Sequence, residues 1–410
     1  MTIDQSSLGR ARSALLTCAV GAVSSLTFAA DSQEDPNSIK TFSDFLAQGT
    51  ASGQVGVGAN YRINDNASDP GLSWGYVQAS YITPDWNGFT AGGGFLGVGE
   101  IWENHSGDFS SVFQEPFDVQ QLFLEYQNEP ETIGAALGRK SMAVNPGQDG
   151  DYQQGVNFQA STPEGFSLTL TAINRWIKYS TYNYDTHGIT GWEDVSDVYP
   201  EAGEVYFSAT ADIPIGSQVS LSPYFNYQEN VMAFYGATFD SSIPVNSIAE
   251  GSLWETSLIL SIYDNQVSAS IQPEYEDAWG GLFETGLDLG NYGLAIGTYW
   301  ISDDTIDTGA GAFNIFDPLK EDDLYPFNDQ NDFQLYYAKG RVVLGDLTLY
   351  PAIGIGRNYA LESDSLEIDL LFEYQLPGNF ELEGYLVYVD FERDVLPNFL
   401  VGGFTLGYGF

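Results

Sequence analysis

Side chains that commonly carry catalysis are scarce in this sequence. It contains two histidines, His105 and His187, and one cysteine, Cys18. A thiol nucleophile, a soft-metal centre or a histidine relay would need more of these residues than the chain supplies. A barrel-embedded hydrolase would place a histidine beside an acid and a serine at the barrel rim, and no serine or second carboxylate stands at a diagnostic spacing from either histidine. We therefore predict no enzyme, no cofactor and no metal centre, with a barrel-embedded hydrolase as a less favoured alternative.

Acidic clusters offer a different chemistry, the coordination of a hard cation by carboxylate oxygens. Such clusters lie at positions 65–69, 303–307 and 322–323. Carboxylates of this kind can bind Ca²⁺, but no cluster has the spacing of an EF-hand loop, and solvated acidic loops have the same composition. Whether these loops bind Ca²⁺ therefore stays open.

The net charge of the chain is strongly negative. Thirteen Lys and Arg residues stand against 56 Asp and Glu residues, which gives a formal charge of −43. Nucleic-acid binding depends on neutralising phosphates with basic side chains, so this class of function is excluded. Charged residues make up 17% of the chain, below the roughly 25% of soluble domains, while aromatic residues reach 15% and glycines number 45. This composition favours β-sheet over a helix bundle.

The elements that must position these acids are strands with a two-residue period. In residues 366–376, apolar side chains occupy the even positions and acids occupy most of the odd ones. The same alternation recurs at 254–262, 267–275 and 219–227. Because successive side chains of a strand point to opposite faces, one face of each segment suits hydrocarbon and the other suits water.

Two kinds of connection separate these segments. Short turns are predicted at 83–88, 128–131, 162–165, 213–216, 264–265, 290–291, 344–346 and 376–379, and longer polar connections at 103–117, 178–203, 228–252 and 302–331. Short turns at one end and long loops at the other are typical of outer-membrane barrels. Counting through these connections gives about eighteen strands (16–18). We therefore predict an all-β protein, a transmembrane antiparallel β-barrel with short periplasmic turns and long extracellular loops.

The first thirty residues have the pattern of a secretory signal peptide. Arg10 and Arg12 precede an apolar run at 13–30 that ends in small residues. The predicted organisation is a signal peptide at 1–30, an N-terminal periplasmic segment at 31–50 and a transmembrane barrel at 51–410. The one cysteine then lies in the signal peptide, and the mature chain has no disulfide.

The terminal segment, 399–410, alternates a glycine-rich face with an apolar face and ends in Phe410. A terminal strand that ends in Phe resembles the signal by which Gram-negative outer-membrane proteins are recognised for barrel insertion. We therefore predict that Phe410 is an assembly signal and that the barrel assembly machinery is a partner.

Two stretches carry a resemblance to a known family. Residues 38–49, SIKTFSDFLAQG, and residues 52–55, SGQV, resemble the N-terminus of Opr-family porins, where a short helical segment and a G-x-x-x-G run enter the first strand. Residues 136–140, ALGRK, lead into a Gly/Asp loop at 147–155 and resemble the passage from strand to constriction loop in the same porins. The family comprises OprD-like porins and epsilonproteobacterial major outer-membrane proteins. The resemblance implies an eighteen-stranded porin of the Gram-negative outer membrane.

The predicted lumen departs from one feature of that family. OprD-type channels are associated with a ladder of basic lumen side chains that guides carboxylate-bearing substrates. Here the inward candidates are Lys140, Arg175, Lys339 and Arg341 against Glu125, Glu255, Glu274, Glu367, Asp369, Glu373, Glu381 and Glu383. Uptake of anionic nutrients by a basic ladder is therefore in doubt.

Acidic walls concentrate cations and exclude anions in a water-filled lumen. We therefore predict a porin for passive diffusion of ions and small hydrophilic solutes that prefers cations, with a substrate-specific uptake channel of OprD type as the alternative. General solvation of an acidic protein is a second explanation for part of the charge. The loop at 141–152, with Asp149 and Asp151, either constricts the pore opposite basic wall residues or is an ordinary solvated loop.

The expected surroundings are outer-membrane lipid and lipopolysaccharide outside the barrel and small ions and solutes inside it. The sequence leaves open the solute, the pore size and whether the protein is a monomer or a homotrimer.

Overall fold

The computed structural model describes most of the chain, and the structural statements below concern the described ranges. These are residues 41–64, 71–104, 117–129, 132–142, 152–177, 192–197, 202–266, 277–302, 332–359, 362–392 and 398–410. The predicted signal peptide, 1–30, and the first half of the predicted periplasmic segment, 31–50, lie outside them.

Strands account for almost all regular structure in these ranges. They are β1 (Thr50–Asn64), β2 (Gly71–Ile82), β3 (Phe89–Glu103), β4 (Phe117–Gln127), β5 (Ile133–Ser141), β6 (Tyr152–Ser161), β7 (Ser167–Ile177), β8 (Trp192–Asp194), β9 (Tyr206–Pro214), β10 (Val219–Gln228), β11 (Met232–Pro244), β12 (Leu253–Asn265), β13 (Ala278–Asp288), β14 (Tyr292–Ile301), β15 (Phe333–Leu344), β16 (Leu347–Asn358), β17 (Ser363–Leu376), β18 (Phe380–Phe391) and β19 (Phe399–Gly409). The described helices are α2 (Phe42–Ala47) and the 3-10 helix η2 (Val195–Asp197). Neither is long and apolar enough to cross a membrane.

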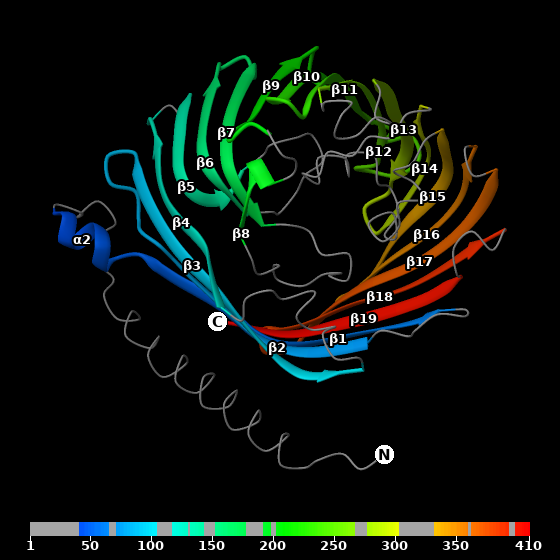
Figure 1. The fold of residues 1–410 in the computed structure, drawn as a ribbon, viewed down its shortest axis with the longest axis horizontal. Coiled ribbons are helices and arrows are strands. Elements are labelled where there is room, and N and C mark those ends of the chain that lie inside the picture. The colour runs from blue at the N-terminus through cyan, green and yellow to red at the C-terminus, as the bar shows by residue number, and fades with distance from the viewer. Residues whose placement is uncertain are drawn as a thin grey trace, which may run out of the picture.

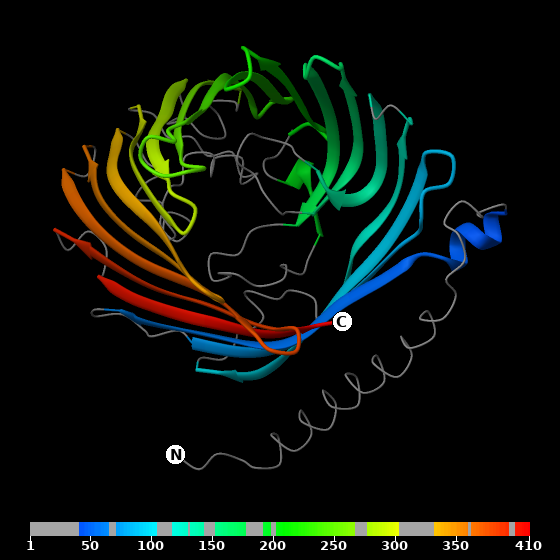
Figure 2. The same cartoon turned by 180° about the vertical axis from the view of Figure 1, so that it is seen from behind.

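Eighteen of the strands form a closed antiparallel ring (Figures 1 and 2). The ring closes where β19 pairs with β1, in a register that runs from Gln54 opposite Gly409 to Asn64 opposite Phe399. The remaining strand, β8, pairs with the end of β7. Since β7 also pairs directly with β9, the ring is continuous without β8. In both views β8 lies within the outline of the ring. The predicted barrel of about eighteen strands is confirmed.

Side chains of the ring strands alternate between the lumen and the outer surface. In β17, the outward-facing Ile368 and Leu370 are 44% and 40% exposed, whereas the inward-facing Glu367 and Asp369 are 7% and 3% exposed. Large apolar side chains exposed on the outside of a barrel are stable against hydrocarbon, and acids are not. The outer surface of the ring is therefore suited to a lipid bilayer.

Aromatic side chains border this apolar surface. Near the tight turns, the ring of Phe89 lies tilted against that of Tyr126, and the ring of Phe380 lies tilted against that of Tyr408, each pair with ring centroids 4.9 Å apart. At the opposite end, the exposed outer side chains include Trp279 and Tyr359. Aromatic girdles at both borders of an apolar band are typical of transmembrane barrels, because their rings have an apolar body and a polar edge.

Most tight connections lie at one end of the ring, as the sequence predicts, whereas the short connection at 229–231 between β10 and β11 lies at the other end. Those at the first end join β2 to β3, β4 to β5, β6 to β7, β9 to β10, β13 to β14, β15 to β16 and β17 to β18. Positive φ angles at Asn87, Gly88, Gly345 and Gly378 give several of these turns their conformation, which glycine and asparagine adopt with little strain.

Two predicted connections are wrong. Asp264 and Asn265, predicted as a turn, lie inside β12 and pair with β11. The predicted long loop at 228–252 instead contains β11, which follows β10 after a short connection at 229–231. The predicted strand at 267–275 lies outside the described residues. The predicted number of strands is nevertheless right. The turn wrongly predicted within β12 adds one strand to the count, and the missed strand β11 removes one.

An apolar cluster occupies the lumen at the end opposite the tight turns. Phe234, Phe333 and Val387 are almost fully buried there, and Val195 of η2 belongs to the same cluster. The buried Gln228 anchors the inner segment, since its Nε2 donates hydrogen bonds to the carbonyl oxygen of Val195 (2.7 Å) and of Gly203 (3.1 Å). The segment 192–197 is therefore held against the inner wall and narrows this end of the barrel.

The helix α2 precedes the first strand near the tight-turn end. A capping box begins it: the Asp44 backbone N–H donates to Thr41 Oγ1 (3.2 Å) and the Thr41 N–H donates to Asp44 Oδ2 (3.0 Å). Such reciprocal bonds satisfy N–H groups that a helix start leaves without partners. Phe45 is buried, with its ring 5.7 Å from that of Trp86 in the β2–β3 connection. The contact fixes α2 against the barrel.

Glycines on β1 make room for aromatic side chains that lie along the inner wall. A Cβ atom at Gly58 would meet the indole of Trp74 on the neighbouring strand. We expect Gly58→Val to force this indole out of place and to lower the free energy of unfolding by about 1–3 kcal/mol, the usual cost of overpacking. Gly99→Val is the matched control, because no atom lies within 4 Å of an added Cβ there. Urea unfolding of the detergent-solubilised protein measures both, and equal shifts would contradict the prediction.

Candidate functional site

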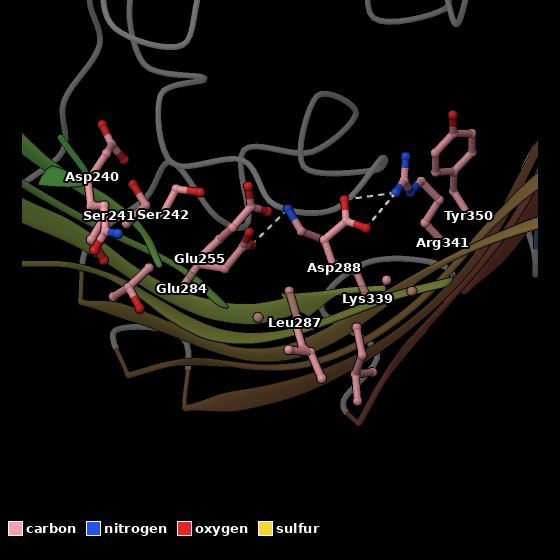
Figure 3. Close-up of a pocket in the computed structure, with 18 of the residues that line it drawn as sticks. Asp240, Ser241, Ser242, Glu255, Glu284, Leu287, Asp288, Lys339, Arg341 and Tyr350 are labelled. Atoms are coloured by element: carbon pink, nitrogen blue, oxygen red, sulfur yellow. Dashed lines mark hydrogen bonds and ion pairs between the residues drawn. The ribbon is translucent and has the colours of Figure 1, made fainter. Parts of the chain in front are cut away.

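A cavity of about 950 Å³ lies on the lumen side of the wall near the tight-turn end (Figure 3). Polar side chains project from one side of the sheet there, while Leu287 projects from the other. The charged residues of the lining are Asp240, Glu255, Glu284, Asp288, Lys339, Arg341 and Asp369. Acids outnumber bases in this lining, and both bases lie on β15.

Lys339 lies in a network with two neighbouring groups. Its Nζ is 2.7 Å from Oε2 of Glu284, and the Tyr337 hydroxyl donates a hydrogen bond to the same oxygen at 2.7 Å. The Lys339 side chain is 41% exposed and the Glu284 side chain 24%. An ion pair of this exposure contributes little to stability, but it cancels a positive charge at the lumen surface.

Arg341 is held in the same manner, one lumen position nearer the turns. Its Nη2 contacts both carboxylate oxygens of Asp288, at 3.0 and 2.8 Å, and donates to the carbonyl oxygen of Gly290 at 2.8 Å. Figure 3 shows the guanidinium beside the ring of Tyr350. Both lumen bases of β15 are therefore paired with acids of β13.

Small residues on the strand between them make these pairs possible. β14 lies between β13 and β15, and its lumen positions in this region include Gly293, Ala295 and Gly297. A Cβ at Gly297 would meet the ring of Tyr337, so the ring lies over this glycine and reaches Glu284. Long side chains of β15 thus cross a whole strand without obstruction.

A second acidic group lies on β17 and β18. The register places Glu373 directly opposite Glu383, and Gln375 opposite Glu381. The Tyr350 hydroxyl donates a hydrogen bond to Glu373 (3.3 Å), and the Gln375 amide donates one to Glu381. Like charges directly opposite each other destabilise a sheet, so strand pairing gives no reason for the position of Glu373 and Glu383.

Glu367 and Asp369 share the lumen face with Glu373, but their surroundings differ. At 7% and 3% exposure they are buried, whereas Glu373 is exposed. A buried carboxylate has less direct contact with lumen water, so the two groups are not equivalent. The predicted pore-lining role of these acids stays a prediction.

The opposite part of the ring brings together two more predicted residues. Lys140 Nζ lies 2.9 Å from Glu125 Oε2 and 5.1 Å from the centre of the Phe123 ring. Arg175, at the end of β7, has its Nε 2.8 Å from Oδ1 of Asp194 in β8. Arg175 therefore contacts the inner segment where β7 extends beyond its pairing with β9.

Several predicted site residues lie outside the described residues. They are Glu274, Asp149 and Asp151, together with most of the loop at 141–152 and both histidines, His105 and His187. In the part of the chain that the structure describes, no group of three or more His, Cys, Asp or Glu residues is placed to hold a metal ion.

Sequence reasoning missed three acids of the cavity lining. Asp240 lies on β11, the strand that was not predicted, and Glu284 and Asp288 lie on β13, between small and apolar residues. Alternation within 278–288 would have assigned both β13 acids to one face. The buried Arg62 was missed as well, and its guanidinium lies 3.8 Å from the centre of the Phe399 ring.

Comparison with known proteins identifies relatives only at the level of the fold. No family model matches the sequence, and no curated protein matches it. Among solved structures, OpdQ of Pseudomonas aeruginosa matches with a TM-score of 0.67 and 12% identity, over 88% of this chain and 98% of OpdQ. OccK9 (OpdG) of the same organism has a TM-score of 0.69 and 10% identity, over 89% and 99%. OccAB4 of Acinetobacter baumannii has a TM-score of 0.65 and 9% identity, over 88% and 98%.

Such low identities with such complete coverage show a shared architecture. The chain has the eighteen-stranded barrel fold of OprD-family outer-membrane porins, so the fold implied by the sequence resemblance is confirmed. The location predicted from the sequence, the outer membrane of a Gram-negative cell, agrees with this fold and with the apolar outer surface.

Proposed function

We propose that this protein is an outer-membrane porin, a water-filled channel for passive diffusion of ions and small hydrophilic solutes, and that it prefers cations. Barrels of sixteen to eighteen strands are wide enough to leave an aqueous channel. The outer surface is apolar, and the lumen carries charged side chains. These properties support a conduit across a bilayer and give no support to a catalytic centre.

The observation that carries the cation preference is the balance of charge on the lumen wall. Lys339 and Arg341 are each paired with an acid of β13, so they contribute little net positive charge. Asp240 and Glu255 form no ion pair with a described base and remain as negative charge in the same cavity. In a lumen bounded by low-dielectric lipid, such charge concentrates cations and repels anions.

A substrate-specific uptake channel of OprD type is the second candidate. The observation that favours it is the placement of Lys339 and Arg341 on one face of β15, two residues apart and facing the cavity. A solute with a carboxylate could compete with Glu284 or Asp288 for these bases. Solute-dependent block of the ion current would distinguish this channel from a general porin.

The partners that we propose follow from the same location. They are outer-membrane lipid and lipopolysaccharide, the barrel assembly machinery, and the ions and solutes that pass through. Monomer and homotrimer are alternatives, which the mass of the detergent-solubilised protein distinguishes.

Recording of purified protein in a planar bilayer tests the proposal. Under a KCl gradient we expect steady ohmic current without any added substrate, and a zero-current potential on the cation-selective side. The absence of conducting events from folded protein would remove the channel function. Anion selectivity would remove the cation preference and would favour the second candidate.

A further inference from the structure

One side of the lumen cavity is formed by serines and acids of β10, β11 and β12. They are Ser220, Asp240, Ser242, Glu255 and Ser257, and we call them the serine–acid patch. Among the residues that the structure describes, neither carboxylate and none of the three hydroxyls has a hydrogen-bond or ion-pair partner. The polar groups of the patch are therefore available to water or to a solute in the lumen.

The sheet register alternates serines and acids within the patch. Asp240 pairs with Ser220 on β10 and with Ser257 on β12, and Glu255 pairs with Ser242. Asp240 and Glu255 are thus diagonal neighbours on adjacent strands, which lie within about 8 Å of each other. One small cation between these two carboxylates can contact both.

A similar arrangement on β9 shows how serines satisfy an acid that lies within reach. Asp212 accepts hydrogen bonds from Ser167 Oγ at 2.7 Å and from Ser222 Oγ at 2.8 Å, so protein donors already occupy its carboxylate. Asp240 also lies between two serines in the register, yet neither hydroxyl donates to it. Its carboxylate therefore keeps its capacity to accept hydrogen bonds from a solute.

A buried hydroxyl lies beside the patch. Thr238 is two residues from Asp240 on β11, so both side chains are on the lumen face of the strand. Thr238 is 7% exposed, and its Oγ1 has no hydrogen-bond partner in the described part of the chain. A buried hydroxyl without a partner is unfavourable, so this position favours a polar neighbour that the protein does not supply.

The other side of the cavity is charged, but its charges are compensated. Lys339 and Arg341 are bound by Glu284 and Asp288, and in Figure 3 Arg341 lies at the opposite end of the view from Asp240. A carboxylate of a solute has to displace an acid of β13 before it can reach either base. An ammonium group at the patch displaces only water.

We propose that the serine–acid patch binds a primary ammonium ion that carries hydroxyl groups, the chemistry of an amino alcohol or an amino sugar. The proposal rests on the channel of the proposed function, since the solute reaches the patch through the lumen. The ammonium group donates hydrogen bonds to Asp240 and Glu255, and such charge-assisted bonds are stronger than neutral ones. Hydroxyls of the solute donate to and accept from the serine hydroxyls beside each acid.

The same chemistry defines which solutes are poorer ligands. A neutral sugar has the hydroxyls but lacks the charge that Asp240 and Glu255 attract. A quaternary ammonium ion has the charge but no N–H group to donate. The specificity that we propose therefore needs both features in one molecule, and the cavity of about 950 Å³ has room for a monosaccharide.

Block of the ion current in planar bilayers tests the proposal. Glucosamine is the probe, glucose is the matched solute without charge, and choline is a cation without N–H donors. We expect Asp240→Asn and Glu255→Gln each to raise the half-blocking concentration of glucosamine by about tenfold, or about 1.4 kcal/mol. Replacement of Ser220, Ser242 and Ser257 together by Ala keeps the charge. We expect this variant to raise the same concentration by about threefold, since neutral hydrogen bonds are weaker, without moving the zero-current potential.

Asp212→Asn is the matched control, because it removes the same charge from a carboxylate that serines already occupy. We expect it to change the block by glucosamine less than about twofold, since its bonds to protein donors already use the carboxylate. An equal loss in Asp212→Asn and Asp240→Asn would overturn the proposal and leave a general effect of charge. Block by glucose or choline as strong as that by glucosamine would overturn it as well.

Saturation-transfer NMR of glucosamine with the detergent-solubilised protein measures binding without conduction, and it separates this proposal from the channel function. A protein that conducts and prefers cations, but neither binds glucosamine nor is blocked by it, loses the patch alone. A protein that binds glucosamine through Asp240 and Glu255 but conducts nothing loses the channel function alone.

Discussion

Glutamine in place of Glu373, Glu381 and Glu383 is expected to move the zero-current potential of the channel toward anion permeability. The register sets these three acids together on β17 and β18, so their fields add within one part of the lumen. Wall charges focused by low-dielectric surroundings produce potentials of several kT, so the cation-to-anion permeability ratio should fall by about three- to tenfold. Recording under a KCl gradient measures the shift. It should shrink in about 1 M salt, where the screening length is about 3 Å.

The matched control removes three acids from the same end of the barrel but off the wall. Glu129, Glu164 and Asp346 lie in tight connections and are exposed, so their amides change the same net charge outside the lumen. We expect a small shift for this set. Equal shifts for both sets would mean that the acidity only hydrates the protein surface. Anion selectivity in the unmodified channel would mean that the wall charge is compensated.

The alternation of side chains was enough to predict the barrel, because a strand with one face in hydrocarbon and one in water leaves a strict two-residue signal. β17 carries that signal clearly, and its inward and outward faces are those predicted. β11 lacks it, since residues 232–244 mix glycine, alanine and serine with aromatic residues on both faces. The connection between β10 and β11 is only three residues long, 229–231, with Asn230 at φ 59°. The boundary between these strands was therefore not recognised from the sequence.

Parity also predicts which face a charged residue occupies, but it does not predict its partner. Lys339 and Arg341 lie on the lumen face, and their contacts with Glu284 and Asp288 span β14. Those contacts depend on the small residues Gly293, Ala295 and Gly297 of β14. The sequence of β15 alone therefore does not predict them. The burial of Asp369 could not be predicted from the sequence either. It depends on the side chains that pack inside the ring and not on the strand that carries the residue.

The same interplay of glycine and aromatic residues closes the barrel. Gly53 of β1 has its N–H 3.0 Å from the carbonyl oxygen of Phe410, and the Phe410 N–H lies 2.9 Å from the carbonyl oxygen of Gly53. A Cβ at Gly53 would meet the Phe410 ring, so the ring lies over this glycine on the outer face. The last residue of the chain thus extends the seam between the first and last strands by one reciprocal pair of hydrogen bonds.

Deletion of Phe410 is therefore expected to lower the yield of folded barrel by more than about tenfold, with little change in the conductance of the barrels that do form. Two backbone hydrogen bonds at about 1 kcal/mol each are lost at the seam, together with the apolar contact over Gly53, and a tenfold change needs only about 1.4 kcal/mol. The heat-modifiable fraction on SDS gels measures folding, and single-channel recording measures conductance. The role in assembly that the sequence predicts for Phe410 implies the same direction of change in cells.

Phe404→Ala provides the comparison that separates closure from general loss of outer apolar surface. Phe404 lies on the same strand and the same face and is 46% exposed, but its backbone bonds to β1 and β18 do not depend on its side chain. We expect a reduction in folded barrel well below that of the Phe410 deletion. If Phe404→Ala reduced folding as strongly, the seam would have no special part in assembly. If the Phe410 deletion altered conductance more than yield, the C-terminus would act on the pore and not on closure.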